Sequence, residues 1–412
     1  MLLEFAIQNF KSFKDLQVFS MEASKEKEND ENVVRVVKTK GDYRVVKTKA
    51  IYGANASGKS NLIKGLVSMW QIMEYNLIDK EVFQKFIAPY RLDEKLRNQP
   101  SYFQIIFIHE GNKYRYGFEV DKKKVHREWL YLKRDKEVLL FEREGQKLIE
   151  INETTFKEGK ILRKGIKMFT EKTLVISILD QLNSEIATLV RGSITHNMII
   201  SPTLFVPTVG TNILYPKIIN YFETDEDFKE WISNILKEVD PSILALMIQS
   251  NTLPDGRIDK IPVIVRKDIA DLVGLPFDLV IEEASGTKKM FEYSLIIYLS
   301  IKFGRTLVID EMDALLHPKL TRKIIELFQS PEAHPEAQLI FATHDTNLMD
   351  NELLRRDQIT FVEKSNEGFS EIYDLSDIND VRANDLFEKN YLKGNYGALP
   401  VLNNFENTLL NE

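Results

Sequence analysis

Hydrophobic and polar positions alternate near the start of the chain, where they predict strands. LLEFAIQNF, residues 2–10, alternates weakly and predicts a first strand. Two Val-rich runs surround a Gly-Asp step in RVVKTKGDYRVVKTK, residues 35–49, a pattern that predicts a hairpin. Residues 103–141 again combine apolar runs with polar turns, so we expect antiparallel strands there.

A helical period replaces this alternation in the middle of the chain. Apolar residues recur three and four positions apart over residues 174–194 and 215–250, which predicts helices in both segments. Three short apolar runs follow, namely LVIEEAS (279–285), TLVID (306–310) and LIFATH (339–344). Strands that are apolar throughout are typical of a parallel sheet covered on both faces, so the pattern predicts an α/β fold.

The strongest chemical motif, residues 53–60, lies between a predicted strand and a predicted helix. GANASGKS matches the phosphate-loop (Walker A) pattern G-x-x-x-x-G-K-[ST] in full, and this context argues against a chance glycine-rich turn. Its glycines let backbone N–H groups and a helix N-terminus point at one anion. Lys59 would hold the β- and γ-phosphates of ATP, and the Ser60 hydroxyl would bind Mg²⁺. The candidate nucleotide contacts in this loop are Gly53, Asn55, Ser57, Gly58, Lys59, Ser60 and Asn61.

Two further motifs place polar side chains after predicted strands. Asp310 follows the run 306–309, where it can hold Mg²⁺, and Glu311 is then placed to orient or deprotonate a water (Walker B). Such paired acids are often only a solvated helix cap, but beside a phosphate loop we interpret them as catalytic. His344 ends the run 339–344. A lone histidine is usually an ordinary residue, but its position after a strand favours a catalytic role.

Ser285 and Gly286 stand at the predicted start of another helix and form a second candidate anion site. Because one nucleotide already has its phosphate loop, this second site is best explained if it caps the γ-phosphate of ATP held by another copy of the chain.

Composition limits the kinds of site and the cellular compartment that the chain can have. The chain of 412 residues is 43% hydrophobic and contains no cysteine, which excludes disulfides and thiolate metal sites. The N-terminus becomes charged too early for a signal peptide, and no apolar run is long enough for a bilayer, so we expect a cytoplasmic protein. The net charge is -7, yet residues 111–172 carry an excess of Lys and Arg. Within them, residues 122–136 suit nucleic acid, although exposed lysines on antiparallel strands often serve only solubility or edge protection.

These motifs together resemble the ABC-class ATPases, in which the signature helix of one subunit closes on ATP bound by its partner. The resemblance implies that Ser285 and Gly286 belong to the signature, and that His344 is the switch histidine. Residues 313–317 fall where the D-loop of that family lies. Thr287 and Lys288 depart from the transporter signature, and His317 replaces the usual D-loop acid.

The whole chain is similar to the OLD-like ATPases of the RloA and abortive-infection type, relatives of the SMC and RecF heads. The similarity is carried by LEFAIQNFKSF, IYGANASGKSNLIKGL, EASGTKKM, VIDEMDALLHPKL, the THD triplet and KNYLKGNYGALPVL. In the related heads the N-F-K-S stretch lies beside the nucleotide, which makes Lys11 and Ser12 candidate contacts. The assignment of the Q-loop glutamine stays open, with Gln104 and Gln181 as the two candidates.

The resemblance implies an ABC/SMC-like P-loop ATPase head with a mixed parallel core sheet, an antiparallel β subdomain and a helical insertion. We expect an N-terminal ATPase lobe with the phosphate loop over residues 1–175 and a helical insertion over 176–260. A C-terminal ATPase lobe with signature, Walker B and switch histidine would cover 261–412. The residues before Ser285 lack sustained heptads, and those after His344 are too few for a Toprim nuclease domain.

The implied function is an ATP- and Mg²⁺-dependent switch in anti-phage (abortive infection) defence. It would form a homodimer around ATP, or a higher homo-oligomer, and control a separate effector protein such as a nuclease in trans. Nucleic acid or a phage protein would be the trigger, and no membrane is involved. Residues 176–255 and 111–172 are the candidate docking surfaces, with the acidic stretch 220–232 as a candidate face unless it covers the chain's own sheet. Two alternatives remain open: a RecF-like DNA-binding repair ATPase, and a slow-turnover scaffold that sequesters a toxin. We expect no nuclease activity, because no second cluster of carboxylates or histidines has metal-ligand spacing.

Overall fold

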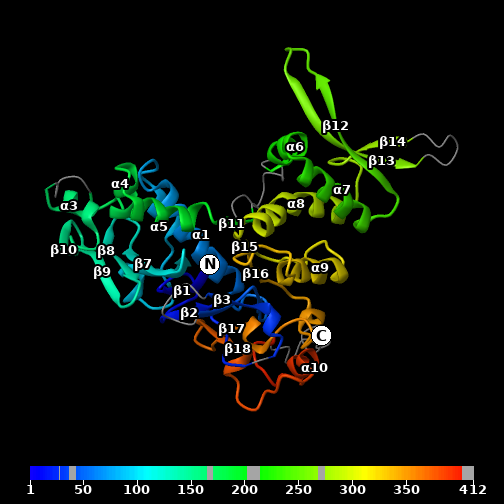
Figure 1. Cartoon of the computed structure of the whole chain (residues 1–412). Helices are drawn as coiled ribbons and strands as arrows, with labels where there is room; N and C mark the ends of the chain where they lie inside the picture. The colour runs from blue at the N-terminus through cyan, green and yellow to red at the C-terminus, as the bar shows by residue number, and fades with distance from the viewer. Residues whose placement is uncertain (27, 37–42, 165–169, 202–213, 268–273, 401–412) are drawn as a thin grey trace, which may run out of the picture.

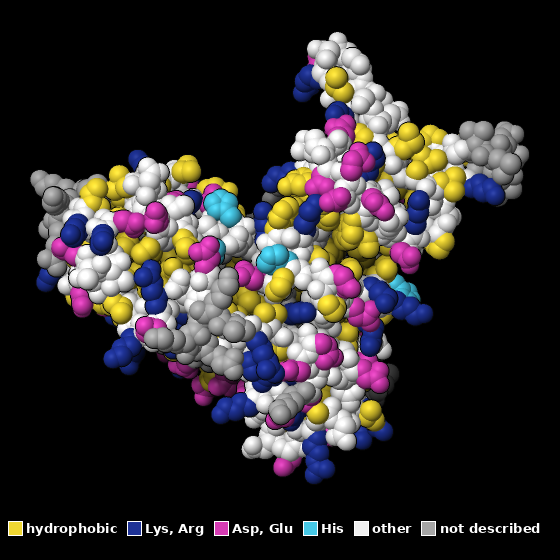
Figure 2. All heavy atoms as spheres, in the orientation of Figure 1, with side chains coloured by type: hydrophobic (Ala, Val, Ile, Leu, Met, Phe, Trp, Pro, Cys, Tyr) yellow, Lys and Arg dark blue, Asp and Glu magenta, His cyan; other side chains and the backbone are white. Residues whose placement is uncertain are grey.

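The computed structural model describes residues 1–26, 28–36, 43–164, 170–201, 214–267 and 274–400. Its elements surround a central parallel sheet (Figure 1). An antiparallel sheet with short helices lies on one side of it, and a helical region with a projecting hairpin lies on the other. The outline is indented between these two regions, as the space-filling view also shows (Figure 2).

The central sheet of the described chain has six strands in the order β11-β15-β16-β5-β17-β18. They are β5 (Thr48–Tyr52), β11 (Met198–Ile200), β15 (Thr306–Ile309), β16 (Gln338–Ala342), β17 (Ile359–Lys364) and β18 (Ser370–Asp374). All neighbours run parallel except β17 and β18. β5, β15 and β16 are buried along their whole length, as a sheet covered on both faces requires. The strands predicted at 306–310 and 339–344 are confirmed.

A second, antiparallel sheet has the order β10-β9-β8-β7-β6-β1-β2. Its strands are β1 (Leu2–Gln8), β2 (Gln17–Ser20), β6 (Ser101–His109), β7 (Asn112–Val120), β8 (Val125–Lys133), β9 (Glu137–Glu144) and β10 (Lys147–Ile151). The strands predicted over 2–10 and 103–141 are therefore confirmed. β3 (Val33–Val36) and β4 (Tyr43–Val46) pair antiparallel, which confirms the hairpin, although its turn at 37–42 lies outside the described residues.

Helix α1 (Lys59–Tyr75) joins the cores of these two sheets. One hydrophobic cluster contains Phe5 of β1, Leu66 of α1 and Ile340 of β16. Gly65 permits the close approach, because a Cβ there would lie 2.4 Å from the Ile7 side chain. The short helices of this region are α2 (Val82–Phe86), α3 (Lys160–Lys164), α4 (Val175–Gln181) and α5 (Glu185–Thr195). Two of them, α4 and α5, confirm the helical prediction for residues 174–194.

The third region packs around the long helix α8 (Ser285–Phe303). It contains α6 (Tyr215–Thr224), α7 (Glu226–Val239), β12 (Ile243–Thr252), β13 (Ile258–Lys267) and β14 (Gly274–Asp278). Phe228 and Ile232 of α7 form a hydrophobic cluster with Phe291 of α8. The β12–β13 hairpin projects from this region (Figure 1), and hydrophobic side chains gather over α7 and α8 (Figure 2).

The prediction of helix over residues 215–250 is wrong from residue 240 onward. Asp240 precedes Pro241 and is extended, with φ −143° and ψ 106°, because the residue before a proline is disfavoured in the α region. β12 then begins at Ile243. Ile243 and Leu246 are buried three positions apart, a spacing that imitates a helix.

The prediction of a strand at 279–285 is also wrong. β14 ends at Asp278, whose Oδ1 accepts hydrogen bonds from the N–H groups of Val280 at 2.7 Å and Ile281 at 3.0 Å. These bonds turn the chain toward α8, which begins at Ser285 as expected.

The remaining elements complete the fold. They are the helices α9 (Pro318–Gln329) and α10 (Phe387–Leu392), and the 3₁₀ turns η1 (Asp30–Asn32), η2 (Leu96–Asn98), η3 (Lys157–Gly159), η5 (Thr346–Leu348), η6 (Arg356–Gln358) and η7 (Leu375–Asp377). No described helix is both long and apolar enough to cross a membrane. The α/β class with a mixed core sheet, an antiparallel sheet and inserted helices is confirmed. The division of the chain at residues 175 and 260 stays a prediction.

Candidate functional site

Three strands of the central sheet end side by side, and the candidate residues follow their ends. In the sheet register Ile51 lies opposite Ala342, and Phe341 lies opposite Ile309. The chain segments that begin at residues 53, 310 and 343 therefore leave the sheet at the same edge. Ligands of parallel sheets bind at this carboxyl edge. The structure thus brings together the phosphate loop, the acid pair and the strand-end histidine.

The backbone of residues 53–58 depends on glycine. Gly53 and Gly58 have φ values of 150° and 125°. Gly58 precedes α1 without a side-chain cap, so the first N–H groups of the helix stay available to an anion. Lys59 begins α1, and its Nζ donates hydrogen bonds to the carbonyl oxygens of Gly53 at 2.7 Å and Ala54 at 3.2 Å. A positive charge therefore lies directly on the loop.

Other side chains brace this loop or remain free within it. Ser57 is buried, and its Oγ has no hydrogen-bond partner among the described residues. Asn55 is exposed at the tip of the loop. Asn61 Nδ2 donates to Ser12 Oγ at 2.9 Å, which ties α1 to the N-terminal turn.

The acid pair follows β15 directly. Asp310 Oδ1 is buried and has no hydrogen-bond partner within the described chain. Burial raises the pKa of Asp310, the Ser60 side chain lowers it by hydrogen bonding, and the charge of Glu311 raises it. Glu311 is exposed and has φ 51°, so the backbone turns sharply at the first residue that could meet a bound water.

Ser60 and Asp310 fit a magnesium site. Hydroxyl and carboxylate oxygens are ligands that Mg²⁺ accepts, and the Ser60 side chain is close enough to Asp310 to lower the pKa of this carboxyl. The second carboxylate oxygen of Asp310, Oδ1, has no other role in the described structure. No group of three or more His, Cys, Asp or Glu residues suited to a metal occurs in the described part of the chain. Mg²⁺ is commonly held by one or two carboxylates together with substrate phosphates, which suits this donor set.

Lys59, Asp310, Glu311, Asp313 and His344 form one electrostatic cluster. Burial lowers the pKa of Lys59, while the three carboxylates raise it. Partial desolvation and then the charge of Lys59 lower the pKa of His344, and the same carboxylates oppose this shift. The His344 backbone N–H donates to Asp313 Oδ1 at 3.3 Å. The imidazole is therefore biased toward its neutral form beside the loop.

Ser285 and Gly286 begin α8 as expected, and Ser285 is exposed. Gly286 approaches the 313–316 segment of its own chain, because a Cβ there would lie 3.1 Å from the Leu315 carbonyl oxygen. The exposed serine of this step remains free to face another molecule. Its role across a dimer stays a prediction.

The N-terminal turn contacts the phosphate loop chiefly through Ser12. A Cβ on Gly58 would lie 3.0 Å from Ser12 Oγ. Lys11 is half-buried, and burial followed by the nearby charge of Lys64 lowers its pKa. The structure therefore brings Ser12 directly to the loop, while the role of Lys11 stays a prediction.

The two Q-loop candidates lie in the antiparallel-sheet region. Gln104 is on β6, where its Oε1 accepts a hydrogen bond from Trp129 Nε1 at 3.1 Å. Gln181 ends α4 and is exposed. Neither position supports a choice between them.

The basic strands and the acidic stretch have structural partners. Arg127 forms ion pairs with Glu119 and Glu142, and Arg115 pairs with Glu137, so much of the positive charge on β7 and β8 is balanced. The stretch 220–232 is two helices separated by Asp225, which caps α7 by accepting from the Phe228 N–H. Its apolar face packs against α8, β12 and β13, and Trp231 also packs on the hydrophobic cluster of the central sheet.

Three residues near the site were not predicted. The Ser370 hydroxyl donates to the Ser57 carbonyl, which braces the loop from β18. Tyr293 of α8 is buried, and burial and then nearby carboxylates, including Asp310 and Glu311, raise its pKa. Lys289 Nζ lies 4.7 Å from the Tyr293 ring centroid. Residues 285, 289 and 293 are spaced to share one helix face, which was the available signal.

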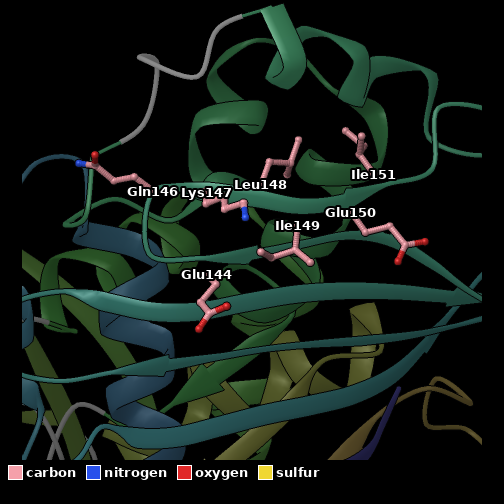
Figure 3. Close-up of a pocket in the computed structure, with 7 residues that line it drawn as sticks. All are labelled: Glu144, Gln146, Lys147, Leu148, Ile149, Glu150 and Ile151. Carbon is pink, nitrogen blue, oxygen red and sulfur yellow. The ribbon is translucent and has the colours of Figure 1, made fainter.

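A pocket far from these motifs lies along the edge strand β10 (Figure 3). Its volume is about 750 Å³, and Glu144 and residues 146–151 line it. The side chains of Leu148 and Ile151 point toward the neighbouring helices, whereas Glu144 points away from them (Figure 3). This pocket contains none of the candidate site residues.

Comparisons with known proteins show the family of the chain. Residues 50–187 and 253–350, more than half of the chain, match the domain family described as "AAA domain, putative AbiEii toxin, Type IV TA system". No curated protein matches the chain at a significant level. Among solved structures, the SMC head domain from Thermotoga maritima is similar at 15% identity and a TM-score of 0.44, over 90% of this chain and 98% of that one.

Two further solved structures are similar over 90% of this chain. The SmcHead bound to the C-winged helix domain of ScpA is matched over 97% of its length, at 15% identity and a TM-score of 0.48. The Smc head domain with an extended coiled coil, bound to the C-terminal domain of ScpA derived from Pyrococcus furiosus, is matched over 96%, at 13% identity and a TM-score of 0.42. These similarities are too distant to carry an argument about function.

Proposed function

The chain belongs to this AAA-domain family of P-loop ATPases, and from that premise we propose that it binds ATP with Mg²⁺ and hydrolyses it. One observation carries the proposal. Lys59 bonds to the carbonyls of a glycine-shaped loop while lying in the same electrostatic cluster as Asp310, Glu311 and His344. A merely structural loop would not require a buried carboxylate oxygen without a partner beside it.

Each residue of this cluster has a distinct task in the proposed reaction. Lys59 and the N-terminus of α1 would bind the phosphates, and Ser60 and Asp310 would hold Mg²⁺. When bound, Mg²⁺ would neutralise negative charge on the phosphates. Glu311 would orient a water and accept its proton as the water oxygen bonds to the γ-phosphorus and the bond to ADP breaks. His344, biased toward neutrality, would donate a hydrogen bond to the γ-phosphate.

The proposed active unit is a homodimer. Ser285 is exposed at the N-terminus of a long helix, where N–H groups and the helix dipole favour an anion. In the dimer this end of α8 would close on ATP held by the phosphate loop of the partner. The contact of Gly286 with the D-loop segment of its own chain supports this arrangement, because closure would then move both segments together.

The proposed cellular role is that of an OLD-like switch of the RloA type, which controls a separate effector in anti-phage defence. The set of motifs from the N-F-K-S stretch to the C-terminal KNYLKGNYGALPVL supports this assignment by resemblance. The family description names a toxin of a toxin–antitoxin system, which adds a second candidate in which this chain is itself the toxin. A RecF-like repair ATPase and a scaffold that sequesters a toxin remain the alternatives.

Hydrolysis is tested with the purified chain and its Lys59→Ala variant. We expect Mg²⁺-dependent release of phosphate from ATP by the natural sequence. The variant should bind ATP much more weakly, because it lacks the charge on the phosphates. Equal ATP binding by both proteins in calorimetry would contradict the assignment of the loop.

The cellular role is tested in the native host with and without the neighbouring genes. Growth arrest that needs those genes supports a separate effector. Arrest by this chain alone, after the genes are deleted, favours the toxin candidate and overturns the switch proposal. Co-purification from the host would identify the effector.

A further inference from the structure

A concave, basic surface lies away from the nucleotide site, and we call it the basic groove. It has a volume of about 730 Å³. Arg91 and Arg97 contribute from the loop that follows α2, and Lys122 and Lys123 contribute from the turn between β7 and β8. All four side chains are exposed. Cations from two distant segments therefore meet around one hollow.

The basic side chains that line the basic groove outnumber its acidic ones. No acidic side chain pairs with these four residues in the part of the chain that the structure describes. Asp121 is the one acid among the described lining residues, and it is already engaged. Its Oδ1 accepts from the N–H groups of Lys123 and Lys124 at 2.6 and 2.8 Å, and its Oδ2 lies 2.9 Å from His126 Nε2. The basic residues of the adjacent strands, by contrast, are paired with glutamates.

Hydrogen bonds of Arg97 and Asn9 fix the shape of the basic groove. Arg97 Nε donates to the Arg91 carbonyl at 2.7 Å, which orients this guanidinium. The buried Asn9 side chain holds the same loop. Its Nδ2 lies within hydrogen-bond distance of three carbonyls between residues 96 and 100, at 3.0 to 3.2 Å, and its Oδ1 accepts from the Tyr90 N–H at 3.0 Å. These hydrogen bonds thus hold the backbone of the loop in a defined conformation.

The same N-terminal turn connects the basic groove to the phosphate loop. The Lys11 N–H donates to the carbonyl of Ala88, a groove-lining residue, at 2.7 Å. The next residue, Ser12, accepts a hydrogen bond from Asn61 and contacts Gly58. Asn9 and Lys11 both have left-handed φ values, near 50°, so the turn has little freedom to deform alone. A structural displacement at one end of this turn is therefore expected to move the other end.

We propose that the basic groove binds the phosphodiester backbone of a nucleic-acid strand, and that this binding is coupled to ATP binding through residues 9–12. Two cations on each wall suit a linear polyanion whose phosphates pass between them. Lys and Arg contacts of this kind position a strand without reading its sequence. The coupling rests on the proposed function, whereas the binding of nucleic acid does not.

Binding is tested by fluorescence anisotropy with labelled single-stranded and duplex oligodeoxynucleotides of mixed sequence. With four phosphate contacts, the logarithm of the single-strand affinity should fall with the logarithm of salt with a slope of about −3 between about 50 and 200 mM. Lys122→Glu/Lys123→Glu should weaken binding at least about tenfold and reduce the slope. Arg91→Gln/Arg97→Gln should act in the same direction through the opposite wall.

The matched control is Lys217→Glu/Lys237→Glu, which makes the same charge change at exposed lysines of α6 and α7. It should bind as the natural sequence does. Equal affinity of the Lys122→Glu/Lys123→Glu variant and this control would overturn the proposal. Competition by polyglutamate as effective as by unlabelled DNA would also overturn it, since the site would then select charge rather than nucleic acid.

Coupling is measured by titrating a non-hydrolysable ATP analogue with and without saturating oligonucleotide. Linkage requires the oligonucleotide to change analogue affinity by the same factor as the analogue changes oligonucleotide affinity. Both groove variants should abolish that factor while keeping the analogue affinity of the free protein. An unchanged analogue affinity in the presence of bound oligonucleotide would contradict the coupling. Failure to bind the analogue at all would instead contradict the nucleotide site.

Discussion

Gly53 combines a backbone conformation and a close contact that another residue type cannot tolerate. Its φ is 150°, and a Cβ would lie 2.2 Å from the Val362 carbonyl oxygen and 2.7 Å from Ser57 Oγ. Gly53→Ala must therefore displace either the loop or β17. We expect ATP affinity, measured by calorimetry, to fall by at least about tenfold, which is about 1.4 kcal/mol.

Gly192→Ala is the control for this prediction. Gly192 lies within α5, and the nearest side-chain atom to an added Cβ is His196 Nδ1 at 3.6 Å. Alanine should stabilise the helix by roughly 0.5–1 kcal/mol and leave ATP binding unchanged. Normal ATP affinity in Gly53→Ala would show that the loop does not need its observed shape to hold phosphates.

Glu311 permits a test that separates binding from chemistry. Glu311→Gln keeps the size of the side chain and leaves Asp310 in place, so ATP and Mg²⁺ should still bind. The neutral amide cannot accept a proton from water, and we expect hydrolysis to slow by about 10²–10⁴-fold. Single-turnover phosphate release measures this step. Glu230→Gln, on the exposed face of α7, should hydrolyse ATP normally. Normal turnover in Glu311→Gln would remove Glu311 from its proposed role.

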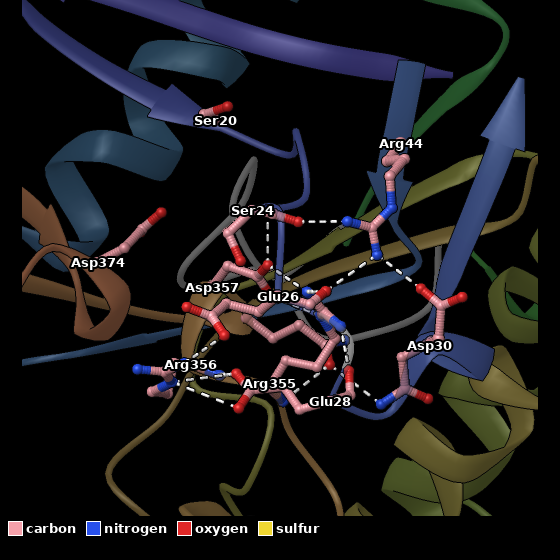
Figure 4. A network of polar contacts seen from close by, with 12 residues as sticks. Ser20, Ser24, Glu26, Glu28, Asp30, Arg44, Arg355, Arg356, Asp357 and Asp374 are labelled. Atoms are coloured by element: carbon pink, nitrogen blue, oxygen red, sulfur yellow. Dashed lines mark hydrogen bonds and ion pairs between the residues drawn. The ribbon is translucent and has the colours of Figure 1, made fainter. Parts of the chain in front are cut away.

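At the scale of elements, a buried ion pair within η6 and its N-cap lies beside the N-terminal segment and hydrogen-bonds to it (Figure 4). Arg355 Nε and one terminal nitrogen donate to the two carboxylate oxygens of Asp357 at 2.8 and 2.7 Å. The Ser24 N–H also donates to Asp357, at 2.7 Å. Both charged side chains are buried, and Arg355 reaches the carbonyls of Glu26 and Glu28 as well. This pair therefore fixes the segment that precedes β3 and β4.

The pair also predicts how stability depends on pH. Burial alone would raise the pKa of Asp357, but the Arg355 guanidinium and the Ser24 N–H outweigh it and hold this pKa below its usual value. The carboxylate thus contributes stability above about pH 4, and that contribution is lost as pH falls through the folded-state pKa. Asp357→Asn should lower stability at pH 7 by about 3 kcal/mol and flatten the loss below pH 4.

Urea unfolding at several pH values measures both effects. Asp259→Asn is the control, because Asp259 is exposed on β13. It should leave both the stability and its pH dependence nearly unchanged. If Asp357→Asn loses stability at low pH as steeply as the natural sequence does, this pair does not determine the response to pH.

Sequence patterns predicted those elements whose signal is local. The phosphate loop and the strands at 306–310 and 339–344 have a contiguous motif or an unbroken apolar run. β12 was missed because a strand with one partly buried face imitated the helical period. The supposed strand at 279–285 failed because the Asp278 side chain turns the chain there. Ser370 could not be found from local pattern, since only the pairing of β18 with β17 brings it to the loop.

At the scale of the whole molecule, the proposed dimer assigns the two halves of one ATP site to different subunits. The phosphate loop contacts the N-terminal turn and β18, whereas Gly286 approaches the Leu315 carbonyl of its own chain. A single chain would then provide a loop without a facing signature. In this proposal a symmetric dimer completes the arrangement, because each subunit would contribute a different half to each of the two sites.

Mixing two inactive variants tests this arrangement directly. Ser285→Arg places a bulky cation at the exposed start of α8, and Lys59→Ala removes the charge from the loop. Each homodimer should be inactive. In the mixed dimer, one interface pairs the Lys59 loop of the first variant with the Ser285 helix of the second, so about half of the natural ATPase activity per mixed dimer should return.

The control for the mixture replaces Ser285→Arg with Lys217→Arg, a change to an exposed residue of α6 that should leave ATPase activity intact on its own. Two affinity tags, purified in sequence, isolate the mixed dimers before the assay. If confirmed mixed dimers of the two inactive variants stay inactive while each variant retains its fold by circular dichroism, Ser285 does not complete a site in trans. Restored activity, by contrast, requires an intact loop and an intact signature on opposite chains, because no single chain in the mixture carries both.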